Sequence, residues 1–189
     1  MKSVLLSTHP KWCEKIGHKI GTDKNGKPIY EKSIEVRKKK PSIPTPFKAY
    51  IYMTKKKPYM LTFAGNGKMR VHNGMVIGEF ICDKVMFLTP LGLRGFEMRE
   101  EILKLMCLTN DDLNAYGGLK PLYGWHISDL KIYDKPKELK DFLLPCGGKL
   151  CWGCNLLKVK GAECINRGKR YATRPPQSWI YVQELEERK

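Results

Sequence analysis

Hydrophobic residues along the chain fall mostly into short runs, many of them alternating with polar residues, which is typical of strands with one buried face. Strands are expected in the segments richest in β-branched and aromatic residues, which are 3–6, 33–37, 47–53, 75–87, 122–133 and 178–182. Gly78 within one of them suggests a bulge. Many short strands with few strand–helix–strand repeats argue against a doubly wound sheet and predict an α+β fold or a small barrel.

Helical spacing of apolar residues interrupts the strands in three places. Residues 12–16 carry one apolar face, and Ser7-Thr8 is the candidate cap that precedes them. The segment 96–108 has the spacing of a longer helix, and 109–112 has the residues that cap a shorter one after it. We therefore expect short helices beside the strands.

A length of 189 residues suits one substantial core, so we expect a single domain over 1–189 with two insertions. The first insertion is expected at about 18–30, where Asn25-Gly26 is a strong hairpin-turn signal. The second is expected at about 145–172, a glycine-rich stretch that also contains cysteines.

Positive charge is concentrated near the start of the chain. The formal net charge is +16, and residues 1–60 hold 15 Lys and Arg against 4 Asp and Glu. This asymmetry favours a polyanion such as nucleic acid, because neutralised phosphates release counterions. The alternative is a surface that only confers solubility. No run approaches the roughly 20 apolar residues of a membrane helix, and the sequence lacks a signal-peptide pattern, so we expect a cytoplasmic protein with no membrane partner.

Four of the seven cysteines cluster in the second insertion. In a reducing compartment, clustered thiols more often bind metal than form disulfides. A structural zinc ion, held by a loop that lacks its own core, is one hypothesis. Free thiols or a labile disulfide are the alternatives. The residues concerned are Cys146, Cys151, Cys154 and Cys164.

Four segments in order resemble an ASCH-domain protein of a kind common in bacteriophages and their hosts: 5–12, 32–37, 76–80 and 176–179. The ASCH signature has the form Gly-x-Lys-x-x-Glu-x-Arg, and Tyr30 stands where its glycine would lie. The resemblance implies a PUA-like small β-barrel with flanking short helices. It also implies a cleft between the first helix and the barrel, suited to nucleic acid or a modified nucleoside.

The signature segment has the chemistry of a nucleotide pocket. Glu35 and Arg37 are two residues apart on a predicted strand, so they share a face, and Lys32 lies in the neighbouring turn. A guanidinium offers a bidentate fork for phosphate, and a carboxylate accepts from a base amino group. The alternative is an exposed ion pair without function.

The leading hypothesis is a binding module for nucleic acid, with RNA favoured, or for a modified nucleotide. Ser7 and His9 lie at a strand-to-helix junction that favours an anion, with simple capping as the alternative. Basic loops with aromatic neighbours are further candidates. The full expected set is Ser7, His9, Trp12, Lys32, Glu35, Arg37, Lys38, Lys39, Lys55, Arg170 and Arg174.

Two other functions stay open. Some ASCH relatives hydrolyse acylated cytidines with a lysine, a threonine nucleophile and a glutamate, but the position matching the threonine is Glu35 here. A hydrolase of modified nucleosides or RNA would instead use Lys32 and a water-activating Glu35 as catalytic residues. The third hypothesis is a phage-borne protein that binds and modulates a host protein.

Overall fold

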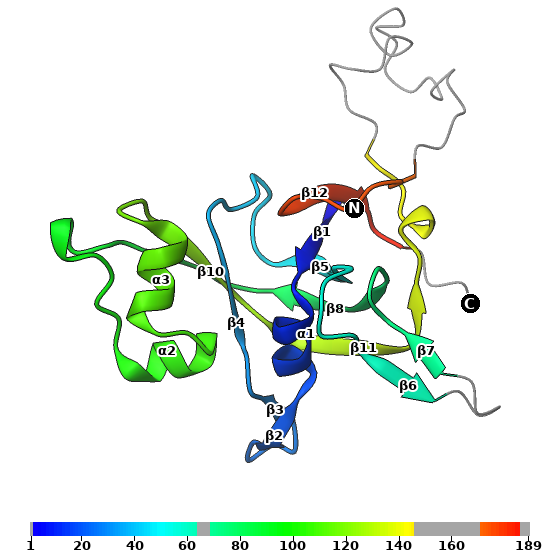
Figure 1. Cartoon of the computed structure of the whole chain (residues 1–189), viewed down its shortest axis with the longest axis horizontal. Coiled ribbons are helices and arrows are strands. Elements are labelled where there is room, and N and C mark those ends of the chain that lie inside the picture. Colours follow the sequence, from blue (N-terminus) through cyan, green and yellow to red (C-terminus); the bar gives the residue numbers. More distant parts are fainter. Residues whose placement is uncertain (1, 64–68, 146–170, 186–189) are drawn as a thin grey trace, which may run out of the picture.

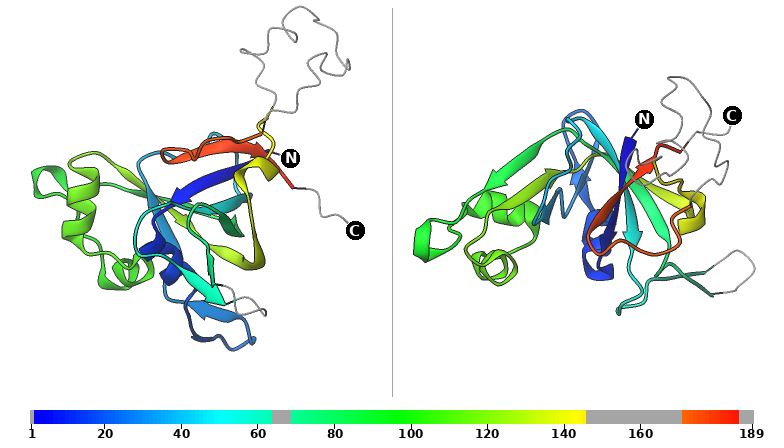
Figure 2. Two further views of the ribbon diagram at one scale, coloured as in Figure 1. Left: turned by 45° about the vertical axis from the view of Figure 1, so that its right-hand side comes forward. Right: turned by 90° about the horizontal axis from the view of Figure 1, so that it is seen from above.

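The computed structural model describes residues 2–63, 69–145 and 171–185, and it confirms the predicted α+β class (Figures 1 and 2). The main sheet is mixed, with strand order β11-β8-β5-β1-β12. The β1–β5 pair is parallel, and the other pairs are antiparallel. Its strands are β1 (Lys2–Thr8), β5 (Phe47–Met53), β8 (Val76–Cys82), β11 (Ser128–Lys137) and β12 (Trp179–Gln183).

A second, antiparallel sheet has the order β4-β10-β9, and two hairpins pair only with themselves among the described strands. The pairing does not close into the barrel that the resemblance implied, since β11 and β12 are the two edges of the main sheet in the described part of the chain. The strands are β4 (Ile34–Arg37), β9 (Val85–Leu88), β10 (Leu122–His126), β2 (Lys19–Thr22), β3 (Pro28–Tyr30), β6 (Leu61–Phe63) and β7 (Met69–Val71).

The helical segments are short. The expected helix over 96–108 is shorter, because only 100–106 is helical. The shorter helix after it is confirmed, with a capping box between Thr109 and Asp112. No helix in the described ranges is long and apolar enough to cross a membrane. The helical segments are α1 (Pro10–Gly17), α2 (Glu100–Met106), α3 (Asn110–Gly117), η1 (Gly92–Arg94) and η2 (Leu139–Asp141).

Two of the expected long strands are each broken into a pair that serves both sheets. The segment 75–87 splits at Asp83-Lys84, and 122–133 splits at Ile127. Both breaks lie at one corner, where the His126 amide donates to the Lys84 carbonyl at 2.9 Å. The prediction of single strands was wrong. Apolar and polar residues keep alternating through each bend, so the sequence gives no sign of a break that tertiary packing imposes.

Apolar side chains form clusters on both sides of the second sheet. One cluster joins α1 and the main sheet to Trp125, whose ring is fully buried and meets Phe47 edge-on at 5.4 Å. Another lies between the opposite face of the second sheet and the helices α2 and α3. Figures 1 and 2 show α1 between the two sheets and α2 with α3 on the far side of the second sheet. The start of α1 therefore lies where the two sheets meet.

Gly78 occupies the bulge that the sequence suggested. The register of β8 is irregular between Val76 and Gly78 against both of its neighbours. A Cβ atom at Gly78 would lie 2.5 Å from the Lys131 carbonyl oxygen, which belongs to the backbone of β11. Close approach of two strands therefore requires glycine here.

We predict that Gly78→Ala lowers the free energy of unfolding by about 1–3 kcal/mol, since the backbone of β11 must move to admit the methyl group. Urea denaturation measures the change. The matched control is Gly21→Ala, because a Cβ at Gly21 meets no atom within 4 Å. Equal stability of the two variants would contradict the close packing at Gly78.

Candidate functional site

Residues 34–37 of the signature segment form β4. Its side chains alternate between the two faces of the sheet, so Glu35 and Arg37 share a face as predicted. Arg37 Nη2 lies 2.8 Å from Glu35 Oε1, so the two side chains meet on one face of the sheet. Both are buried, with 5% and 7% of Glu35 and Arg37 exposed. The alternative of an exposed surface pair is therefore wrong.

Lys32 reaches the same place from the loop before β4, as expected. Its side chain is only 2% exposed, and its Nζ lies 3.5 Å from Glu35 Oε2. The Nζ also donates to the carbonyl of Met106, the last residue of α2, at 2.6 Å. A helix C-terminus carries unpaired carbonyl oxygens and partial negative charge, which suits a buried ammonium group.

Arg37 ties the cluster to the junction between β1 and α1. Its Nη2 donates to the Ser7 carbonyl oxygen at 2.8 Å and to Thr8 Oγ1 at 3.2 Å. A guanidinium shared between a carboxylate and two oxygens of the β1 end has little freedom to reorient. We call Lys32, Glu35 and Arg37 the ionic triad.

Trp12 covers one side of the triad. The Lys32 Nζ lies 5.0 Å from the centroid of its ring, and the Lys11 Nζ lies 4.8 Å from it. Trp12 is partly exposed, so its ring has a buried cation near it and solvent at its edge. Trp12 therefore lies beside the signature residues.

Three buried polar atoms on this side of the second sheet have no hydrogen-bond partner among the described residues. They are Glu35 Oε2, Arg37 Nε and Trp125 Nε1. Glu35 and Trp125 pair directly across β4 and β10, so their side chains share a face. Buried polar groups are nearly always paired, and a group left over marks a position for water, an ion or a ligand.

Burial changes the protonation of the groups around the triad. It lowers the pKa of Lys32, and the Glu35 carboxylate acts against this change without cancelling it. Burial also raises the pKa of the Cys13 thiol, and the nearby Glu35 charge adds to the effect. Cys13 is 2% exposed and belongs to the core.

Ser7 and His9 make structural hydrogen bonds. Ser7 Oγ donates to the Pro176 carbonyl at 2.6 Å, which links β1 to the segment before β12. His9, rather than the predicted Ser7-Thr8, is the N-cap of α1, and its Nδ1 accepts from the Lys11 amide at 3.3 Å. The capping interpretation fits His9 better than a role in anion binding.

The exposed basic candidates lie on separate elements. Lys38 and Lys39 follow the triad directly, and the Lys38 Nζ lies 4.8 Å from the ring centroid of Tyr116 on α3. Lys55 packs against the turn before β8 at Gly74. Arg174 is exposed in the segment before β12. Only Lys38 and Lys39 thus adjoin the triad in the chain.

The predicted zinc ligands Cys146, Cys151, Cys154 and Cys164, and also Arg170, lie outside the described residues. The described residues hold no group of three or more potential metal ligands. Cys82 is buried like Cys13. The apolar neighbours of Cys107 in the sequence predict a core residue, but this prediction is wrong, because Cys107 is partly exposed at the C-cap of α2 in a left-handed conformation with φ 53°.

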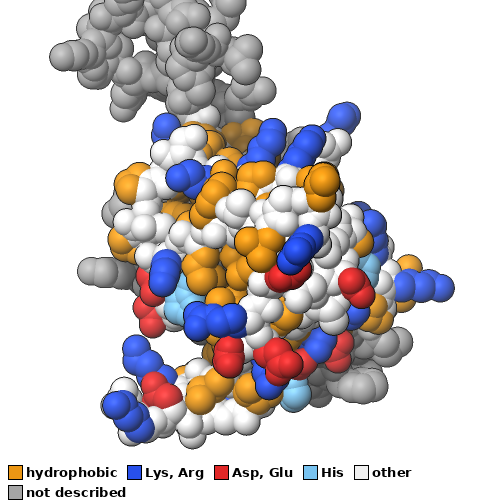
Figure 3. All heavy atoms as spheres, turned by 90° about the vertical axis from the view of Figure 1, so that its left-hand side faces the viewer, with side chains coloured by type: hydrophobic (Ala, Val, Ile, Leu, Met, Phe, Trp, Pro, Cys, Tyr) orange, Lys and Arg blue, Asp and Glu red, His pale blue; other side chains and the backbone are white. Residues whose placement is uncertain are grey.

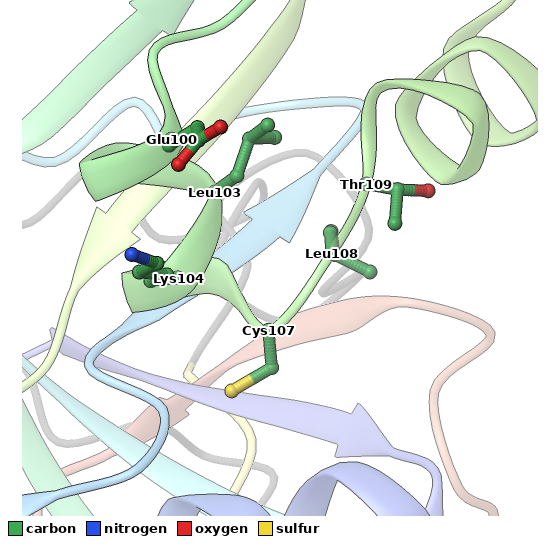
Figure 4. Close-up of a pocket in the computed structure, with 6 residues that line it drawn as sticks. All are labelled: Glu100, Leu103, Lys104, Cys107, Leu108 and Thr109. Carbon is green, nitrogen blue, oxygen red and sulfur yellow. The ribbon is translucent and has the colours of Figure 1, made fainter.

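Cys107 also lines a shallow, mostly apolar groove of about 270 Å³ along α2 (Figure 4). The groove lies on the helical side of the second sheet and holds no member of the triad. Its residues are Glu100, Leu103, Lys104, Cys107, Leu108 and Thr109. Sequence reasoning missed this groove, and it also missed two groups next to the triad, the Met106 carbonyl and Trp125 Nε1. Both are distant in sequence and bear no local signal.

Comparison with known proteins supports the fold. No protein-family model and no curated protein matches the sequence. The structure is similar to the ASCH crystal structure from Zymomonas mobilis, with 14% identity, a TM-score of 0.53, and coverage of 96% of this chain and 88% of that chain. A mutant form of that protein gives 14% identity and a TM-score of 0.46, over 96% and 89% of the two chains. The chain thus has an ASCH-like fold.

We predict that Glu35→Gln lowers the free energy of unfolding by about 3–5 kcal/mol, because Lys32 and Arg37 would stay buried without a counter-charge. The matched control is Asp129→Asn, which removes a carboxylate from an exposed pair with Lys27 at 3.9 Å and should cost less than about 1 kcal/mol. Urea denaturation of both variants checks this. Similar destabilisation of the two would show that the triad carries no special stability.

Proposed function

We propose that this protein binds nucleic acid, with RNA favoured, and that the ionic triad receives one nucleotide of the bound strand. The observation that carries the proposal is the buried triad, in which Glu35 Oε2 has only its 3.5 Å ion pair with Lys32 and Arg37 Nε has no hydrogen-bond partner among the described residues. Two cations and one carboxylate leave net positive charge in a low-dielectric place. Such a site favours a ligand that brings both an anionic group and hydrogen-bonding edges.

A nucleotide matches these requirements. Its phosphate complements the excess cation, and its base offers an amino group to Glu35 Oε2 and a carbonyl group to Arg37 Nε. The partly exposed ring of Trp12 beside Lys32 supplies a surface for stacking. A modified nucleotide meets the same groups, so the proposal covers both ligands.

The surface around the triad supports a polyanionic partner. Lys38, Lys39 and Lys40 are exposed immediately after β4, and the chain as a whole carries +16. An ASCH-like fold is in keeping with association with nucleic acid. A strand bound along these lysines would release counterions, so affinity should fall as salt rises.

We expect measurable affinity for single-stranded RNA at low salt that decreases linearly in log–log form with salt concentration. Lys38→Gln/Lys39→Gln should reduce that slope by about 0.7 for each phosphate that these lysines no longer neutralise. Fluorescence anisotropy with a labelled oligonucleotide measures both quantities. The control with equal charge change is Lys135→Gln/Lys140→Gln, since both residues are exposed near η2, away from β4.

Two results would decide against this proposal. Absence of RNA binding by the wild type at low salt would remove it altogether. If the two double variants have equal salt-dependence slopes, the protein still binds RNA. The RNA would then not contact the lysines next to the triad.

A hydrolase is the second candidate, favoured by one specific observation. The Lys32 ammonium, whose pKa burial lowers, lies 3.5 Å from Glu35 Oε2, and that oxygen has no hydrogen-bond partner in the described structure. A carboxylate in this position is able to activate water, and a neighbouring lysine is able to polarise a carbonyl or phosphoryl oxygen. The substrates to test are acylated cytidines and RNA.

If the wild type turns over such a substrate, Glu35→Gln should reduce the rate at least about 100-fold, because an amide cannot accept the proton. Chromatographic detection of product measures the rate. Asp129→Asn is the control, and circular dichroism confirms that both variants are folded at the assay temperature. A folded Glu35→Gln variant with full turnover would exclude Glu35 as the base.

A further inference from the structure

The exposed aromatic residues of the second sheet form a site of their own. Antiparallel pairing places Phe87 opposite Tyr123, and Tyr123 opposite Arg37. Residues directly opposite each other in an antiparallel pair project from the same face. One row therefore crosses all three strands, from Phe87 on β9 through Tyr123 on β10 to Arg37 of the ionic triad on β4. We call it the aromatic row.

The row changes from buried to exposed along its length. Arg37 is 7% exposed, Tyr123 is partly buried, and Phe87 is 61% exposed. The Phe87 and Tyr123 rings contact each other with centroids 5.5 Å apart and planes inclined at 51°. The row thus joins an exposed ring on β9 to a partly buried ring on β10, which lies opposite Arg37 of the triad.

The rest of the second sheet explains why this surface is unusual. Its opposite face is covered by α2 and α3, which bury Ile34, Val36, Leu88 and Leu122. On the face of the row, α1 and the main sheet cover the end that carries Trp125, which is fully buried. Phe87 lies on β9, an edge strand of this sheet among the described strands, and it is 61% exposed. Its contact with Tyr123 therefore leaves most of the side chain open to solvent.

Cations lie at the same end of the sheet as the row. Because β4 and β10 are antiparallel, the exposed residues 38–40 after Arg37 lie at the same end as Lys120, which precedes β10. Arg94 is exposed on η1, soon after β9. Figure 3 views the side that carries α2 and α3 and shows hydrophobic side chains across the middle of that face, with both basic and acidic side chains around them. An exposed aromatic side chain with cations at the same end of the sheet matches bases joined by phosphates.

We propose that the aromatic row is a stacking platform for the nucleotides next to the one in the triad, with single-stranded RNA as the occupant. This inference rests on the proposed function and adds the path of the strand. Exposed aromatic residues on a sheet stack bases in a sequence-tolerant way. Phe87 is the outermost ring and takes a base on its free face.

The test compares the affinity of an oligonucleotide that has bases with the affinity of one that lacks them. A labelled ten-nucleotide oligouridine and an abasic ribose-phosphate oligomer of equal length carry the same phosphates, so their affinity ratio reports stacking. The wild type should prefer oligouridine by at least about fivefold, and Phe87→Leu should reduce the preference to within about twofold. Phe87→Trp should keep or increase it, since the indole retains a π face.

The matched control is Ile20→Ala, because Ile20 on β2 is 59% exposed, close to the 61% of Phe87. Its affinity ratio should equal that of the wild type, and circular dichroism confirms that all variants are folded. If Phe87→Leu keeps the full preference for oligouridine, or if the wild type binds both oligomers equally, the proposal of a stacking platform is wrong. The proposal of RNA binding is unaffected by either result. If the wild type binds neither oligomer, the proposed function fails and the platform fails with it.

Discussion

A single buried carboxylate holds two buried cations, and the local structure depends on this arrangement. Glu35 meets Lys32 at 3.5 Å and Arg37 at 2.8 Å, and all three are almost inaccessible to solvent. Removing ions from water costs several kcal/mol for each ion, and only close pairing with further hydrogen bonds offsets that cost. The further bonds go to the Met106 and Ser7 carbonyls. The triad therefore fastens the end of α2 and the end of β1 to β4.

Much of this site could be predicted from the sequence because its geometry is local. Residues two apart on a strand share a face, so the meeting of Glu35 and Arg37 needed no tertiary information. The position of Lys32 followed from the adjacent turn, and Trp12 from the resemblance. Burial of all three charges could not be predicted in this way. It depends on α2, which begins more than 60 residues further along the chain and has no signature that points to the triad.

The errors in the fold have a common physical origin. The segments 75–87 and 122–133 keep strand-like composition throughout, yet each crosses from one sheet to the other at the corner near Lys84 and His126. Strand propensity indicates that a residue packs well in a sheet, but it does not indicate which of the two sheets the residue joins. The aromatic row escaped sequence reasoning for the same reason, since Phe87 and Tyr123 become neighbours only through the register of β9 and β10.

The pairing of β1 with β12 has a consequence for the order of events during synthesis. β1 supplies the Ser7 carbonyl that Arg37 binds, and its outer edge is completed only by Trp179–Gln183, while Ser7 Oγ depends on Pro176. A ribosome releases β1 long before β12, so the nascent chain carries an open sheet edge at β1 until 176–183 have been made. Contacts of such large sequence separation form late and slowly. The outer edge of β1 is therefore covered only after nearly all of the described chain has been synthesised and its two ends have met.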